Sequence, residues 1–109
     1  MTPELFESAV RGKGDLAGVF EYDGEAAYFY LYDASGNDAQ KVIDSIHVFS
    51  GPTDLEDADV EVRWDDAGRR VGLFLRGVQW AVFNSASGAK FGGSYDPGAR
   101  PEIPDGEVV

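Results

Sequence analysis

The feature of this chain that most constrains its fold is an Asp-Gly pair, Asp23-Gly24, set between two runs rich in apolar and aromatic residues. The runs are Leu16–Tyr22 and Ala26–Tyr32. An Asp-Gly pair favours the tight two-residue turn of a β-hairpin, because glycine readily adopts the positive φ angle that this turn requires. The stretch therefore predicts two adjacent antiparallel strands and commits the early part of the chain to β-sheet.

The second of these runs has two distinct faces if it is a strand. Residues two apart point to the same side of a strand. One side carries Tyr28, Tyr30 and Tyr32, and the other carries Ala27, Phe29 and Leu31. Both sides are apolar or amphipathic, as expected for a central strand of a sheet.

Further alternating runs predict more strands along the chain. They cover residues 60–64, 70–76, 78–83 and 89–91. The run 41–50 is ambiguous, since Val42, Ile43, Ile46 and Phe49 also fit a helical turn. We favour a strand there, because its second half is β-branched and aromatic.

The two ends of the chain are not predicted to form strands. Thr2 can cap a short N-terminal helix with Pro3 in its first position, and Leu5, Phe6, Ala9 and Val10 fall on one side of that helix. Residues 95–109 contain three prolines and no periodicity, which predicts a mobile C-terminal tail. Residues 1–94 are then expected to form a single compact β domain.

The chain of 109 residues is long enough for one domain with its own core. Successive strands joined by short turns favour a single antiparallel meander of about six to seven strands. We expect the meander to form a small barrel or a two-layer sandwich, because a flat sheet would leave one face uncovered. The predicted fold class is mainly β.

Composition excludes several kinds of chemistry. The chain has no cysteine, which excludes disulfides, thiol catalysis and thiolate-bound metals and fits a cytoplasmic protein. One histidine is too few for a usual zinc site. No apolar run approaches the length of a membrane span, and the N-terminus lacks the pattern of a signal peptide. We therefore expect no metal, no cofactor and no membrane contact.

Charge indicates the kind of partner. The 20 acidic residues outnumber 9 basic ones, for a formal net charge of −11. Such a chain repels nucleic acid and anionic membranes and attracts basic proteins. The densest acidic group lies in a loop that leads into a strand, where it can dock lysine or arginine residues of a partner. This group is Asp54, Glu56, Asp57, Asp59 and Glu61.

The sequence does not supply a complete catalytic set. His47 is the single histidine, and Asp44 precedes it by three residues, which separates the two side chains onto opposite faces if 41–50 is a strand. No G-x-S-x-G nucleophile motif is present. We assign no catalytic residue and favour a protein that is not an enzyme.

The tyrosines allow two functions. An exposed row containing Tyr28 and Tyr30 is typical of a protein interface, where tyrosine is enriched. Alternatively, a pocket in the mouth of a barrel binds a small molecule, with His47, a tyrosine and a carboxylate as its polar groups.

Two segments resemble a family of small, uncharacterised bacterial domains. They are VFEYDGEAAYFYLYD (Val19–Asp33) and VIDSIHVFS (Val42–Ser50). The resemblance implies a bacterial protein, carries no assigned activity, and directs attention to His47 and the tyrosine row. The sequence thus predicts an acidic interaction module, comparable to an immunity or regulatory protein. The alternative is a small-molecule binder or hydrolase-like enzyme with a pocket near His47.

Overall fold

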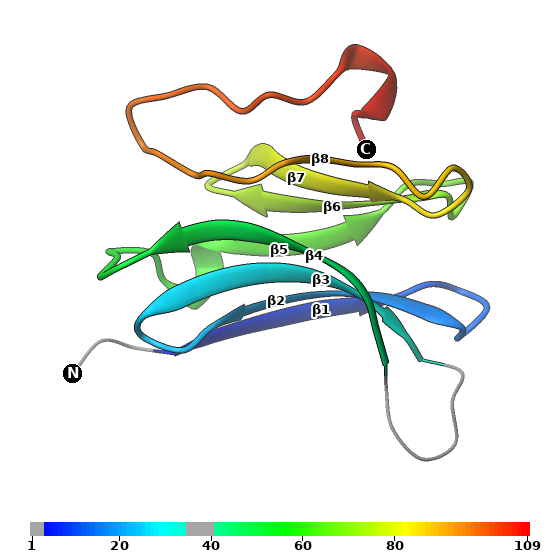
Figure 1. Cartoon of the computed structure of the whole chain (residues 1–109), viewed down its shortest axis with the longest axis horizontal. Helices are drawn as coiled ribbons and strands as arrows, with labels where there is room; N and C mark the ends of the chain where they lie inside the picture. Colours follow the sequence, from blue (N-terminus) through cyan, green and yellow to red (C-terminus); the bar gives the residue numbers. More distant parts are fainter. Residues whose placement is uncertain (1–3, 35–40) are drawn as a thin grey trace.

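The computed structural model describes residues 4–34 and 41–109, which form two four-stranded antiparallel sheets stacked face to face (Figure 1). The first sheet contains β1 (Leu5–Val10), β2 (Leu16–Tyr22), β3 (Ala26–Asp33) and β4 (Lys41–Ser50). The second contains β5 (Val60–Trp64), β6 (Arg70–Leu75), β7 (Val78–Asn84) and β8 (Lys90–Gly92). Single 3-10 turns, η1 (Asp57–Asp59) and η2 (Asp105–Glu107), are the helical elements of the described residues.

The sandwich differs in two respects from the predicted single meander. Strands in each sheet follow sequence order, so the chain makes two successive meanders instead of one. The described chain also has one strand more than the six to seven expected. The mainly β class and the two-layer arrangement are confirmed.

The hairpin around Asp23-Gly24 forms as its sequence predicts. β2 and β3 pair antiparallel, with Tyr22 opposite Ala27. Gly24 adopts a φ of 96°, and the Asp23 carboxylate accepts hydrogen bonds from the N–H groups of Glu25 and Ala26 at 2.8 and 2.9 Å. The ambiguous run 41–50 is a strand, as favoured.

The expected N-terminal helix is wrong, because residues 5–10 form the edge strand β1. This strand pairs with β2 along its whole length. The pairing buries Leu5 and leaves the next residue, Phe6, 63% exposed, whereas a helix would have placed both on one side. Backbone hydrogen bonds to a ready-made neighbouring strand outweigh a weak local helical pattern. The proposed cap, Thr2 with Pro3, lies outside the described residues.

The core fills the space between the sheets. The first sheet contributes Phe20, Phe29 and Val48, and the second contributes Leu73 and Phe83, all fully buried. The rings of Phe29 and Phe83 meet across the layers at 5.1 Å between centroids. A close-packed interior of this kind holds the outer faces of the sheets in fixed positions.

Contacts at both long edges join the two sheets. At one edge, the indole N–H of Trp64 donates to the carbonyl of Ala9 at 2.9 Å. At the other, the chain leaves β8 and crosses to β4, where the N–H of Tyr95 donates to the carbonyl of Val48 at 2.6 Å. The crossing places Tyr95 beside the end of β4.

After Tyr95 the chain runs back over the outside of the second sheet (Figure 1). Side chains of β7 hold it there: Gln79 donates to the Glu107 carbonyl at 3.0 Å and accepts from the Val109 N–H at 2.9 Å, and Asn84 donates to the Glu107 carboxylate at 3.1 Å. These contacts favour an ordered covering segment over the mobile tail that composition indicates. The mobility of 95–109 and the domain boundary after residue 94 stay predictions for hydrogen exchange to decide.

Candidate interaction surface on the first sheet

The outer face of the first sheet is organised in rows of side chains that run across its strands. Strand register sets these rows, because directly paired residues point to the same side. The first row is Phe6, Glu21, Tyr28 and His47; the second is Ser8, Val19, Tyr30 and Ser45; the third is Val10, Ala17, Tyr32 and Val42. We call these residues the tyrosine face.

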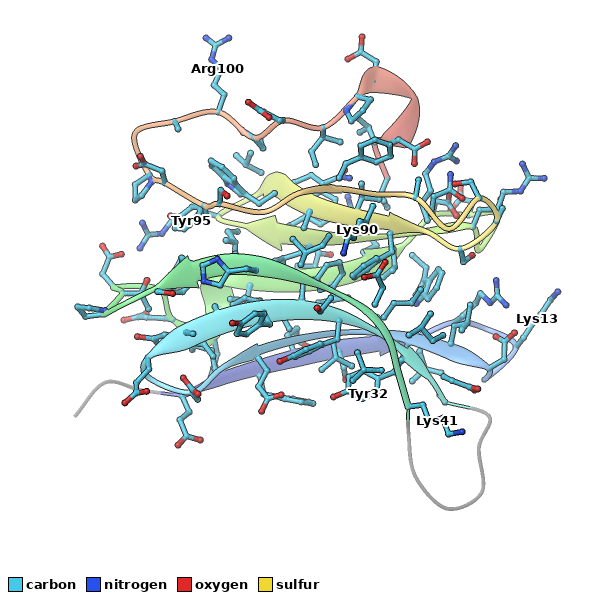
Figure 2. All side chains as sticks on the ribbon, in the orientation of Figure 1. Lys13, Tyr32, Lys41, Lys90, Tyr95 and Arg100 are labelled. Carbon is cyan, nitrogen blue, oxygen red and sulfur yellow. The ribbon has the colours of Figure 1, made fainter. Side chains whose placement is uncertain are left out.

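Aromatic rings pack along the centre of this face. Tyr30 lies between Tyr28 and Tyr32, with centroids 5.8 Å apart on each side. The His47 ring meets Tyr28 edge to face at 5.2 Å. The three tyrosines are half-buried and His47 is exposed, and Val19 beside them is buried although it points away from the core. Figure 2 shows Tyr32 on the side of the first sheet that faces away from the second.

The environment of Tyr30 is both apolar and negatively charged. Burial raises the pKa of the Tyr30 phenol, and the nearby carboxylates of Glu21 and Asp23 raise it further. The two carboxylates therefore lie close enough to the aromatic row to act on it electrostatically. The larger charge effect comes from Glu21, which lies in β2 opposite Tyr28, and the smaller one from Asp23 at the hairpin turn.

Exposed apolar side chains flank the aromatic row. Phe6 and Val10 come from β1, and Val42 and Ile43 from β4, each half or more exposed. The outer face of the second sheet differs, because residues 103–109 of the chain lie against it. A sheet face that no other segment of residues 4–34 and 41–109 covers, and that combines tyrosine with exposed aliphatic residues, has the composition of a protein-binding patch.

The tyrosine face continues into a pocket at the end of β4. His47 Nε2 and the Ser50 hydroxyl are 2.8 Å apart, and Ser50 lines a pocket of about 370 Å³. We call it the end pocket; its other lining residues are Phe49, Pro52, Thr53, Asp54, Tyr95 and Pro97. One continuous surface thus joins Tyr28 and His47 to Asp54, which the sequence had placed in separate groups.

The acidic loop is partly neutralised within the chain. Arg76 pairs with Asp54 at 3.1 Å and with Asp59 at 3.7 Å, and Arg63 pairs with Glu61 at 3.5 Å. Asp59 also accepts a hydrogen bond from the Glu56 N–H at 2.9 Å, which orders the start of η1. Asp59 and Glu61 therefore contribute to local structure, while the exposed carboxylates of Glu56 and Asp57 face solvent.

The same loop lies against the Asp-Gly hairpin. The Gly51 N–H donates to the Glu25 carbonyl at 2.7 Å, and the Tyr22 hydroxyl donates to the Gly51 carbonyl at 2.8 Å. These bonds gather acidic residues from both segments at one end of the sandwich. We call this group the acidic end: Asp23, Glu25, Asp54, Glu56 and Asp57.

A family model described as an uncharacterized protein conserved in bacteria (DUF2251) matches residues 2–101. The chain belongs to the DUF2251 family. The match spans both sheets and confirms the resemblance read from the two segments in the first half of the chain. No curated protein and no solved structure matches the chain.

The DUF2251 sandwich separates His47 from Asp44, as expected for a strand. Lys90 Nζ binds the Asp44 carboxylate at 2.7 Å, and this hydrogen bond lowers the pKa of Asp44. Over residues 4–34 and 41–109, no carboxylate is hydrogen-bonded to the imidazole, whose partner is Ser50. The same residues bring together no group of three or more histidine or carboxylate side chains able to hold a metal ion. The His47 imidazole therefore lies beside Tyr28 and Ser50, whereas the Asp44 carboxylate is paired with Lys90.

Of the residues that line the end pocket, sequence reasoning had named only Asp54 as a site residue. The most consequential omission is Tyr95, whose ring packs against Phe49 at 5.8 Å and Trp80 at 4.9 Å and forms a wall of the pocket. The sequence signal is the preceding Gly92-Gly93 pair, which allows the chain to cross between the sheets. The described residues contain no helix long and apolar enough to cross a membrane.

Proposed function

We propose that this DUF2251 protein is a non-enzymatic module that binds another protein with a basic surface, as an immunity or regulatory protein does. The observation that carries the proposal is the tyrosine face beside the acidic end, which no other element among the described residues covers. Its partner is expected to place apolar residues on the tyrosines and basic residues over the carboxylates.

The two parts of the surface have different roles. Half-buried tyrosines supply a large, rigid contact area at little entropic cost, and they are frequent energetic anchors of protein interfaces. The net charge of −11 attracts a basic partner over long range and raises its association rate. The same charge disfavours nucleic acid and anionic membranes as partners. A cytoplasmic location fits a chain without cysteine.

Affinity capture with matched variants tests the proposal. The tagged chain is incubated with lysate of the bacterium that encodes it, at low salt and again at about 0.5 M salt, where exposed charges are strongly screened. The test variant combines Tyr28→Ser with Tyr30→Ser. The control combines Val78→Ser with Val108→Ser, two exposed apolar positions outside the tyrosine face.

The proposal predicts a protein of basic composition that the native chain and the control retain at low salt. High salt and the tyrosine variant should each release it, and thermal unfolding must show that both variants are folded. A partner that binds the tyrosine variant as well as the native chain would contradict the proposal, and so would failure to capture any protein at either salt.

A small-molecule site near His47 is the second candidate. It is favoured by a groove of about 300 Å³ between β4 and β8, lined by Ser45, Ile46, His47, Lys90, Phe91 and Gly92. The imidazole and the Lys90 ammonium would supply its polar contacts. Ligand screening by thermal shift, with His47→Ala as the variant expected to lose the response, tests this candidate.

A further inference from the structure

We propose that the end pocket receives an arginine or lysine side chain of the basic partner. This inference rests on the proposed function and specifies which chemical group the partner contributes. The pocket combines apolar walls with an exposed carboxylate, and a long cationic side chain needs both.

The walls suit the stem of such a side chain. The rings of Phe49 and Tyr95 stand at 58° to each other with centroids 5.8 Å apart, and each is half-buried by its own packing. Pro52 and Pro97 add rigid apolar surface, and the volume of about 370 Å³ accommodates one long side chain. Aromatic rings attract a guanidinium or ammonium over their faces, and the methylene stem packs on the prolines.

The rim of the pocket supplies the charge. The Asp54 side chain is 82% exposed, and the Arg76 guanidinium contacts its Oδ1 at 3.1 Å. A carboxylate has two oxygens and about four acceptor sites, so Asp54 can bind a second cation from the pocket side. Ser50 and Thr53 line the same pocket, and their hydroxyls already contact His47 Nε2 and the Leu55 N–H.

Charge selects among the occupants of the pocket. An anionic group would face Asp54 and the remaining carboxylates of the acidic end, which repel it. A neutral apolar group would pack against the walls but would make no charged contact with Asp54 at the rim. Arginine gains most, because its planar guanidinium stacks on a ring while donating to a carboxylate.

Nuclear magnetic resonance titration of the whole, isotope-labelled chain tests the inference with capped Gly-Arg-Gly peptide as the probe. Capped Gly-citrulline-Gly is the uncharged control of nearly equal shape. We expect weak binding, with Kd on the order of millimolar, as is usual for one exposed cation on one site. The backbone amide shifts should change at positions 49–51, 53–54 and 95–96, which surround the pocket, and stay unchanged with the citrulline peptide.

Two variants that remove the same charge distinguish binding in the end pocket from nonspecific electrostatic attraction to the acidic surface. Asp54→Asn should raise the Kd of the arginine peptide about three- to five-fold. Glu56→Gln removes the same charge from an exposed carboxylate outside the pocket and should leave the Kd within about two-fold. Arg76→Gln removes the competing cation and should bind the peptide at least as tightly as the native chain.

Equal weakening by Asp54→Asn and Glu56→Gln would overturn the inference, and so would shift changes spread over all exposed carboxylates. The outcome is distinguishable from that of the proposed function. A captured partner that needs Tyr28 and Tyr30 but still binds the Asp54→Asn variant would contradict the role of the end pocket and support the proposed interaction module. Specific binding of the arginine peptide without any captured partner would support a cation site in the end pocket and contradict the proposed interaction module.

Discussion

The rings of Tyr28 and His47 meet edge to face across β3 and β4, with their centroids 5.2 Å apart. Through the contact between His47 and Ser50, this pair joins the aromatic row of the first sheet to the end pocket. A row of tyrosines, a single histidine and an acidic loop thereby become one surface. The predictions below test the contacts that shape this surface and hold it in place.

The Tyr30 phenol should titrate later than an ordinary tyrosine. Burial and then the charge of Glu21 raise its pKa in the folded state, so the neutral phenol stabilises the fold below the ordinary pKa of tyrosine. That contribution is lost as pH rises through the raised pKa. Phenolate absorbance should show a late component that Tyr30→Phe removes, and the variant should lose less stability than the native chain between about pH 9 and about pH 11. If Tyr30→Phe instead removed absorbance that appears at lower pH, the pKa of Tyr30 would not be raised.

Gly93 should be indispensable for the crossing from β8 to β4. Its φ is 92°, and a Cβ there would lie 2.6 Å from the carbonyl oxygen of His47. Gly93→Ala is expected to cost about 3 kcal/mol or more in free energy of unfolding, measured by urea denaturation. Gly88→Ala is the control, because Gly88 has a similar φ of 78° but open space around its Cβ position. Its expected cost is about 1 kcal/mol, and equal costs at both glycines would contradict the tight crossing.

Gly18 lies where the first sheet packs tightly against the second. A Cβ at this position would lie 2.5 Å from Cγ2 of Val71 in β6. Gly18→Ala should cost about 1 to 3 kcal/mol through overpacking. Val71→Ala should cost about 2 kcal/mol by leaving a cavity. The double variant should lose at least about 1 kcal/mol less than the sum, because the two changes compensate in volume. Additive losses in the double-mutant cycle would show that the residues do not meet.

Glu107 should hold the C-terminal segment on the second sheet. Its carboxylate, 17% exposed, accepts hydrogen bonds from Asn84 at 3.1 Å and Arg70 at 3.3 Å. Glu107→Ala should cost about 1 to 2 kcal/mol and speed exchange of the Val109 amide, whose partner is Gln79. Glu102→Ala, at an exposed position, should change neither quantity. Exchange of residues 103–109 at the unfolded rate in the native chain would instead establish the mobile tail that the sequence indicates.

The strands could largely be predicted because their signals are local. Alternation and the Asp-Gly turn give β2 its observed bounds, Leu16–Tyr22, and β3 all but its last residue. The same alternation gives β5 its bounds, Val60–Trp64. Each pattern depends on neighbours within a few residues, which a single sequence displays.

The errors have non-local causes. Leu5, Phe6, Ala9 and Val10 fit a helix by spacing, and pairing with β2 decides against it. The division into two sheets depends on contacts such as the one between Trp64 and Ala9, which no local pattern encodes. A bond between Gly51 and Glu25 likewise gathers the acidic end. The sequence singled out Tyr28, Tyr30, His47 and Asp54, but it indicated neither that they share one surface nor that Tyr95 lines the end pocket.

Radical footprinting of side chains in the captured complex tests the central claim most directly. The account predicts that the partner reduces labelling of Tyr28, Tyr30 and His47, while Val108 on the covering segment keeps the labelling that it has in the free chain. Protection of Val108 with unchanged labelling of the tyrosines would place the partner on the other side of the sandwich and contradict the account.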